Sequence, residues 1–352
     1  MNRWQEEHLN QQAREEARLR WDRVAKPLHA LGRLEDLIAQ VAGIQGTPNV
    51  MLSPRCALVF CADHGVVAEG VTQSGQEVTA LVARSIAEGT GNVNLMASVT
   101  QAEVFAVDMG MTLPVGCPGM IDRRMACGTR NLAVEPAMTR GQAERAVQIG
   151  VDLVGSMKAK GYRIIATGEM GIGNTTASTA MACALLGISP DEITGRGAGL
   201  SDTGLEKKRK VIAQALRLHR PNALDPLDVL AKVGGFEIAG MAGAFLGGMT
   251  HGVPIIMDGV ISAVAALTAV RLCPACRDFV LPSHMSREPA MARIMDELRL
   301  APVIDGGLAL GEGTGAAALL PLLDMAQRVY AGVHTFARLG MDAYTPQEEK
   351  KW

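Results

Sequence analysis

The stretch Ile164–Ala177, IIATGEMGIGNTTA, joins an apolar run to a glycine-rich turn and a polar helix start. The isoleucine pair that opens it is typical of a strand in a parallel sheet, which is apolar on both faces. Gly171 and Gly173 follow, and Asn174 and Thr175 stand where a helix would be capped. Because a helix N-terminus presents unpaired N–H groups and the positive end of the helix dipole, this order predicts a phosphate site.

The same stretch argues against two common nucleotide sites. We expect its loop to open at Gly168. A P-loop requires a lysine between its glycines and the following serine or threonine, and no lysine precedes Thr175 here. The dinucleotide fingerprint is incomplete, because Thr176 stands where its third glycine belongs. A tight strand–helix connection with no ligand is the alternative. Glu169, beside the loop, favours a sugar phosphate, whose ribose hydroxyls need an acceptor.

Length and composition favour one large α/β domain with a small helical addition. The 352 residues are 48% hydrophobic, enough for a sizeable core, but only 3% aromatic. With a net charge of −2, the scarcity of aromatic rings argues against nucleic-acid binding. The N-terminus is charged throughout and no apolar run reaches transmembrane length, so we expect a cytoplasmic protein with no signal peptide.

Sequence motifs for metal, redox and hydrolytic chemistry are missing. The seven cysteines are odd in number and stand mostly in apolar segments, which favours reduced thiols. Cys273 and Cys276 form a lone CxxC pair, so a zinc or redox role is disfavoured. Neither a Gly-x-Ser-x-Gly elbow nor an HExxH motif is present, and no acidic pair suits a magnesium-dependent sugar donor. We therefore expect neither a metal nor a cofactor.

Short apolar runs alternate with helical segments along most of the chain. The predicted strands are residues 56–61, 104–108, the run that begins at Ile164, 254–259 and 279–282. This alternation predicts a doubly wound, mostly parallel sheet of the α/β class. Two helical segments precede the first strand and would form a helical cap.

Acidic residues and a histidine follow several predicted strands. Parallel strands place their carboxyl ends at one edge of the sheet, where open α/β sheets bind their ligands. We expect these residues to meet there: Asp63, His64, Asp108, Glu169, Asp258 and Glu312. For Asp63, capping of the turn is an equal alternative. Among the basic residues 207–210, one turned inward would neutralise a phosphate, although such a run is usually a solvated face.

The glycine stretch belongs to a series of blocks in fixed order. Others are KPLHALGRLE at 26–35, ADHGVVAEGV at 62–71, GTRNLAVEPAMT at 128–139, GRGAGLSD at 195–202, SHMSREPA at 283–290 and LALGEGTGAAAL at 308–319. Over roughly residues 20 to 340 the chain resembles the nicotinate-nucleotide–dimethylbenzimidazole phosphoribosyltransferase family.

That resemblance implies an architecture. The fold would be a Rossmann-like sheet in a large α/β catalytic domain, residues 51–315, beside a small helical domain of residues 1–50 plus 316–345. Residues 346–352 would be a flexible tail. The family also implies a homodimer with sites near the subunit interface.

The resemblance implies a reaction without a cofactor. The ring nitrogen of a benzimidazole-type base attacks the anomeric carbon of nicotinate mononucleotide, nicotinate leaves, and α-ribazole 5′-phosphate forms with inverted configuration. Glu312 corresponds to the general base of the family, and Glu169 and Lys208 correspond to positions that line its site. The other substrate-binding candidates are Gly171, Gly173, Asn174, Thr175, Asp63, His64, Gln76, Asp258 and Gly313.

Departures from the family pattern leave the incoming base open. His29-Ala30 replaces a common Gly-Ser, Gly75 replaces a proline, and Ala309 replaces the usual arginine before GEGTG. Because the loop 69–79 borders the base pocket in relatives, the acceptor stays open among a benzimidazole, a purine and a phenol.

Two rival functions remain at this point. A nucleotide-binding regulatory protein on the same fold would be indicated by loss of Glu312 or Glu169, and both are present. A nicotinamide-dependent oxidoreductase would need an acidic residue about 20 positions past the glycine loop. Residues 185–188, LLGI, stand there instead.

Overall fold

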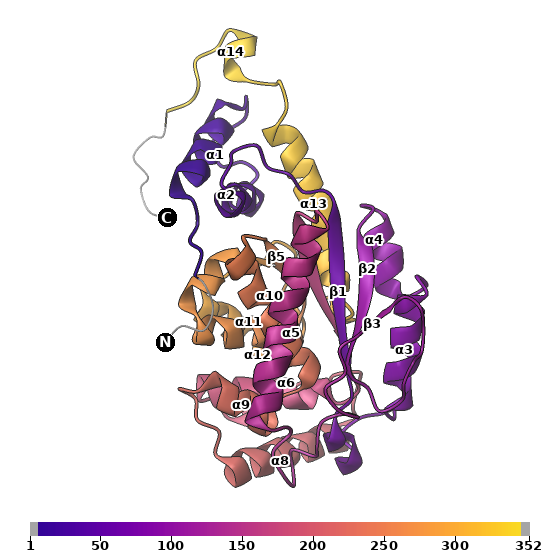
Figure 1. Ribbon diagram of the computed structural model, residues 1–352. Coiled ribbons are helices and arrows are strands. Elements are labelled where there is room, and N and C mark those ends of the chain that lie inside the picture. Colours follow the sequence, from indigo (N-terminus) through magenta and orange to yellow (C-terminus); the bar gives the residue numbers. More distant parts are fainter. Residues whose placement is uncertain (1–5, 346–352) are drawn as a thin grey trace.

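The central layer of the protein is a parallel sheet of six strands (Figure 1). The computed structural model describes residues 6–345. The strands are β1 (Arg55–Ala62), β2 (Glu103–Gly110), β3 (Met120–Asp122), β4 (Ile164–Met170), β5 (Ile255–Met257) and β6 (Val280–Pro282). They lie in the order β3-β2-β1-β4-β5-β6, and every neighbouring pair is parallel. Doubly wound nucleotide-binding folds have this order, so the predicted fold class is confirmed.

The two central strands, β1 and β4, are buried almost throughout. All of β1 and the first six residues of β4 are buried, in agreement with their apolar sequences. Since β4 continues to Met170, the prediction of a loop that opens at Gly168 is wrong. Gly168 stands inside the strand because β4 pairs with β1 as far as Met170. A glycine is needed there because the Glu312 carbonyl packs against it: a Cβ would lie 2.5 Å from that oxygen. The sequence does not predict β3, whose three residues are too few for a periodic signal.

Helices cover both faces of the sheet. The longer ones are α1 (Gln11–Arg23), α2 (Arg33–Gln45), α3 (Glu77–Ala87), α4 (Asn92–Ser98), α5 (Arg140–Ala159), α6 (Asn174–Leu186), α8 (Asp202–His219), α9 (Pro226–Val233), α10 (Phe236–His251), α11 (Val260–Leu272), α12 (Ala290–Leu298) and α13 (Thr314–Tyr330). Alternate residues of β1 point to opposite faces. Leu58 and Phe60 share a core with α5 and α10, whereas Val59 and Cys61 pack with α3 and α4, on the other side (Figure 1).

Helices from the two ends of the chain lie together (Figure 1). The rings of Trp21 in α1 and Tyr330 in α13 are 5.1 Å apart, and Arg20 lies 4.5 Å from the Tyr330 ring. The same apolar cluster includes Ile164 of β4. Since α13 contacts both the terminal helices and the sheet, a domain division at residues 50 and 316 stays a prediction. The predicted tail, residues 346–352, lies outside the described residues.

The described residues contain neither a membrane-crossing helix nor a metal cluster. Within 6–345, every helix is too short or too polar to cross a membrane. In that same range, histidine, cysteine and carboxylate side chains form no group of three that could hold a metal ion. Cys273 and Cys276 are buried free thiols, and the other cysteines are free as well.

Candidate active site

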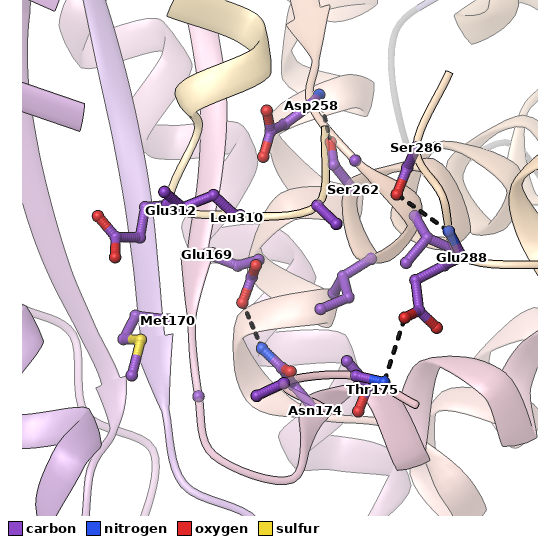
Figure 2. Close-up of a pocket in the computed structure, with 18 of the residues that line it drawn as sticks. Glu169, Met170, Asn174, Thr175, Asp258, Ser262, Ser286, Glu288, Leu310 and Glu312 are labelled. Carbon is purple, nitrogen blue, oxygen red and sulfur yellow. Dashed lines mark hydrogen bonds between the residues drawn. The ribbon is translucent and has the colours of Figure 1, made fainter. Parts of the chain in front are cut away.

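A pocket lies at the carboxyl edge of β4, β5 and β6 (Figure 2). Its walls come from the glycine loop after β4, the loops after β5 and β6, residues 197–198 and 309–312, and Val82 of α3. Six of the predicted site residues line it: Glu169, Gly171, Asn174, Thr175, Asp258 and Glu312. The rule that parallel strands present ligand groups at their carboxyl ends therefore locates the pocket.

The glycine loop ends in an open helix N-terminus. Gly173 is the N-cap of α6, with a φ of 98°, and it offers no side chain to the free N–H groups. The N–H of Asn174 bonds to the Gly171 carbonyl, and the N–H of Thr176 bonds to the Gly173 carbonyl. Within residues 6–345 the N–H of Thr175, between them, has no acceptor. The loop thus keeps a backbone donor and the positive end of α6 available to an anion.

Glu169 and Asn174 form a hydrogen-bonded pair in the pocket (Figure 2). The Asn174 amide donates to Glu169 Oε2, so this side chain leaves the capping position to Gly173. Burial, together with the charges of Asp258 and Glu237, raises the pKa of Glu169 to about 8. Burial therefore favours the protonated form of the carboxyl, which can donate a hydrogen bond as well as accept one.

Lys208 lies directly behind the glycine loop. It is the residue of the basic run 207–210 that turns inward, and its side chain is fully buried. Its Nζ donates to Thr175 Oγ1 over 2.8 Å and to the Gly195 carbonyl over 3.2 Å. Burial lowers the pKa of Lys208 to about 8, against the opposing effect of the Glu288 carboxylate.

The Glu288 carboxylate lies at the same end of the pocket as Lys208 and accepts a backbone N–H there. Its Oε1 accepts the N–H of Gly197 over 3.1 Å, and its backbone N–H donates to Ser286 Oγ over 3.4 Å. Figure 2 shows Glu288 and Glu312 at opposite ends of the pocket.

Glu312 stands in a left-handed backbone conformation, with φ 61°, between Gly311 and Gly313. The Asn92 side chain and the Val93 N–H at the start of α4 act on its carboxyl group and favour the charged form. Among the described residues its Oε2 has no hydrogen-bond partner. Burial raises the pKa of Glu312, and these two groups of α4 oppose that rise.

Asp258 binds the N-terminus of α13 with both carboxylate oxygens. Its Oδ2 accepts the N–H of Gly313 over 3.1 Å, and its Oδ1 accepts the N–H of Ala316 over 2.9 Å. The backbone N–H of Asp258 donates to Ser262 Oγ over 3.2 Å (Figure 2). This predicted site residue thus lines the pocket while its carboxylate holds backbone.

Asp63 and His64 are fully buried and stand outside the pocket lining. Asp63 Oδ2 accepts both the N–H and the hydroxyl of Thr112, at 2.7 and 2.9 Å. His64 Nε2 lies 2.7 Å from Glu237 Oε1.

His64 also supports the loop from behind. A Cβ on Gly173 would lie 3.0 Å from His64 Cβ, and the His64 carbonyl accepts the Gln76 amide over 2.9 Å. Direct substrate contacts of Asp63, His64, Gln76 and Gly313 stay predictions. Asp108, the other strand-end acid, binds Arg124 at 2.9 Å and does not line the pocket.

Sequence reasoning missed several lining residues. His284, Ser286 and Glu288 come from the loop after β6, and Met170 and Leu310 add apolar surface near Glu312. The strand-end rule would have selected the first three, because they directly follow the predicted strand 279–282. Met170 and Leu310 carry no comparable signal.

Comparisons with known proteins agree over nearly the whole chain. A family model described as "Phosphoribosyltransferase" matches residues 7–341. The "Nicotinate-nucleotide--dimethylbenzimidazole phosphoribosyltransferase" of Ruminiclostridium cellulolyticum is 42% identical over 340 residues, which cover 97% of each chain. The protein of the same name from Desulforudis audaxviator is 44% identical over 95% of each chain. A crystal structure of CobT from Thermus thermophilus has a TM-score of 0.88, with 40% identity, over 94% of this chain and 99% of that one.

Proposed function

This chain belongs to the nicotinate-nucleotide–dimethylbenzimidazole phosphoribosyltransferase family, and we propose how its own pocket performs the transfer. It moves the phosphoribosyl group of nicotinate mononucleotide to dimethylbenzimidazole or a related base, and it releases nicotinate. The observation that carries the proposal is the division of the pocket: an open helix N-terminus lies at one end and a carboxylate at the other.

The nucleotide phosphate binds at the glycine loop in this proposal. The free N–H of Thr175 and the positive end of α6 face it, and Lys208 supplies a positive charge next to Thr175 Oγ1. Glu169 lies between the two ends of the pocket and serves the ribose, since its protonated carboxyl both donates and accepts. The anomeric carbon then faces the Glu312 end.

Glu312 acts as the general base. A neutral benzimidazole has one N–H and one lone-pair nitrogen, and attack by the lone pair on the anomeric carbon spreads positive charge over the ring. The N–H becomes acidic, so a carboxylate bonded to it removes the proton and stabilises the developing charge. Oε2 of Glu312 is unpaired among the described residues and is the atom we assign to this proton.

The base itself packs on apolar side chains. Met170 and Leu310 lie near Glu312 (Figure 2), and Val82 also lines the pocket; these apolar side chains suit a flat, apolar ring system. The choice among a benzimidazole, a purine and a phenol is made by these contacts together with the proton that Glu312 takes.

The decisive experiment supplies the purified protein with nicotinate mononucleotide and a panel of azoles, purines and phenols. We expect nicotinate to appear only when an acceptor base is present, together with the matching α-ribotide. A mixture without base is the control. Hydrolysis that is independent of base, or no turnover with any acceptor, would contradict the proposal.

We also propose that the chain forms a homodimer in the cytoplasm. The neighbouring helices α4 and α13 carry exposed apolar side chains, namely Leu95 and Met96 on α4, Val99 directly after it, and Met325 and Val329 on α13. Free thiols are typical of a reducing compartment. Sedimentation of the full chain should give twice the chain mass, and a monomer at assay concentration would count against the dimer.

A further inference from the structure

The conformation of Glu312 needs an explanation that its own segment does not give. A side chain with a Cβ rarely adopts a left-handed φ, and Glu312 has φ 61° between two left-handed glycines, Gly311 at 85° and Gly313 at 90°. Residues in such conformations persist where the surroundings determine them, and they gather at functional sites. Groups outside the segment must therefore hold it.

Two neighbouring strands hold this segment. The Glu312 carbonyl packs against Gly168 of β4, where a Cβ would lie 2.5 Å away. From the end of β5, Asp258 accepts the N–H groups of Gly313 and Ala316 at 3.1 and 2.9 Å. The first of these N–H groups belongs to the residue directly after Glu312, so the bond fixes the peptide that follows it.

Asp258 is itself rigidly placed. It is 2% exposed, and its N–H donates to Ser262 Oγ, which lies 2.7 Å from Thr167 Oγ1 of β4. Gly315 allows the close approach of α13, because a Cβ there would lie 2.9 Å from Asp258 Oδ1 and 2.0 Å from His284 Nδ1. A carboxylate held this firmly, with both oxygens on backbone, transmits position rather than binding a mobile ligand.

We propose that Asp258 is a positioning residue for the transfer reaction: by binding the N–H groups of Gly313 and Ala316, it holds Glu312 in the left-handed conformation that directs its carboxylate to the incoming base. This inference rests on the proposed role of Glu312. It predicts that loss of Asp258 harms the chemical step through Glu312 and leaves the nucleotide site intact, since that site is built on α6 and α8.

The test is a double-mutant cycle of Asp258→Asn and Glu312→Gln on the full chain. Asparagine keeps the size but offers one acceptor oxygen in place of two. We expect kcat of Asp258→Asn to fall about 10²-fold, as small misplacements of catalytic groups do, with the nucleotide KM within about threefold of wild type. Combined with Glu312→Gln it should add no more than about twofold to the loss from Glu312→Gln alone.

Asp225→Asn is the matched control. Asp225 also caps a helix, α9, by accepting the Asp228 N–H over 3.3 Å, and it stands outside the pocket lining. Asparagine keeps the cap and loses only the ion pair with Arg140, so we expect at most a slightly lower Tm and an unchanged kcat. If Asp258→Asn does not fold, Asp258→Ser, a neutral capping residue, takes its place.

The possible outcomes separate three claims: the positioning role, the assignment of the general base and the proposed function. Additive losses in the double variant, or a raised KM with unchanged kcat, would overturn the positioning role. An active Glu312→Gln enzyme would instead overturn the assignment of the base, and a wild type without transferase activity would overturn the proposed function.

Discussion

The N-termini of α6 and α13 are built alike and used in opposite ways. Each follows a Gly-x-Gly turn, and each has a left-handed glycine as its N-cap, Gly173 at φ 98° and Gly313 at φ 90°, so the N-cap residue itself offers no side chain to the helix. At α6 the N–H of Thr175 is unpaired within the described chain. At α13 two N–H groups bind Asp258.

This difference decides which helix end can receive a substrate. Free N–H groups and the helix dipole attract an anion to α6. At α13 the Asp258 carboxylate already lies at the helix end and accepts the N–H groups of Gly313 and Ala316, so a second anion would meet a negative charge there. The N–H of Gly315, the counterpart of Thr175, has no acceptor in the described chain, so the contrast rests on the carboxylate. One backbone device therefore makes a binding site in one place and a rigid support for Glu312 in the other.

We expect the largest loss of activity from a change at Glu312, which directly precedes the N-cap of α13. Glu312→Gln keeps the shape and an acceptor oxygen beside Asn92 and Val93 but removes the basicity. Loss of a general base typically lowers turnover about 10²–10⁴-fold. We expect kcat to fall by that factor in the nicotinate-release assay, with nucleotide binding by calorimetry unchanged.

If the kcat of Glu312→Gln is within a few-fold of wild type, Glu312 at the start of α13 is not the general base. Glu169 would then be the next candidate, because it lines the same pocket. A large loss of nucleotide affinity would show instead that the two helix ends do not act separately.

A smaller effect should come from the α6 end. Lys208→Met keeps much of the buried volume and removes the charge beside Thr175 Oγ1. A charge-assisted phosphate contact contributes roughly 1.5–3 kcal/mol, which corresponds to a rise in nucleotide KM of about 10- to 150-fold. Lys210→Met, on the exposed face of α8, is the matched control and should change nothing. An unchanged KM in Lys208→Met would remove the lysine from the phosphate site.

The pH dependence should agree with this assignment. Burial lowers the pKa of Lys208 to about 8, so the free enzyme loses this positive charge as the pH rises through 8. We expect kcat/KM for the nucleotide to fall above that pH in the wild type. Glu169 also has a raised pKa of about 8, so the informative quantity is the difference between wild type and Lys208→Met, in which the lysine contribution is missing. Identical profiles would contradict the role of Lys208.

How far the sequence predicts this site depends on the range of the contacts. The open turn at α6 is local: its strand, glycines and helix start are contiguous, and the sequence identifies them. At α13 the N–H groups are bound by Asp258, which stands 55 residues before Gly313, and no spacing rule links the two residues. Sequence reasoning places Asp258 at the correct edge of the sheet, and its contact with substrate stays a prediction, but the bonds to Gly313 and Ala316 are not predicted.

The same distinction explains the remaining differences. Gly168 lies in β4, not in the loop, and it is a glycine because the carbonyl of Glu312, far along the chain, packs on it. Met170 and Leu310 reach one pocket from different segments, and their apolar character alone does not distinguish them from core residues.

The smallest effect concerns whether the α6 end is fully open. Glu288 is a carboxylate at that end: its Oε1 accepts the Gly197 N–H, and its charge acts on Lys208. A dianionic phosphate bound there would gain from Lys208 and lose from Glu288. The repulsion between unit charges about 4 Å apart is about 1 kcal/mol in water-like surroundings, or about fivefold in affinity.

Glu288→Gln removes the charge and keeps the size, so inorganic phosphate should inhibit the variant at about one-fifth of the wild-type concentration. Weaker phosphate binding would show that Glu288 orders the site rather than opposing the anion. If phosphate binding tightens while the nucleotide KM rises, Glu288 holds the ribose hydroxyls, and the α6 end recognises more of the substrate than its phosphate.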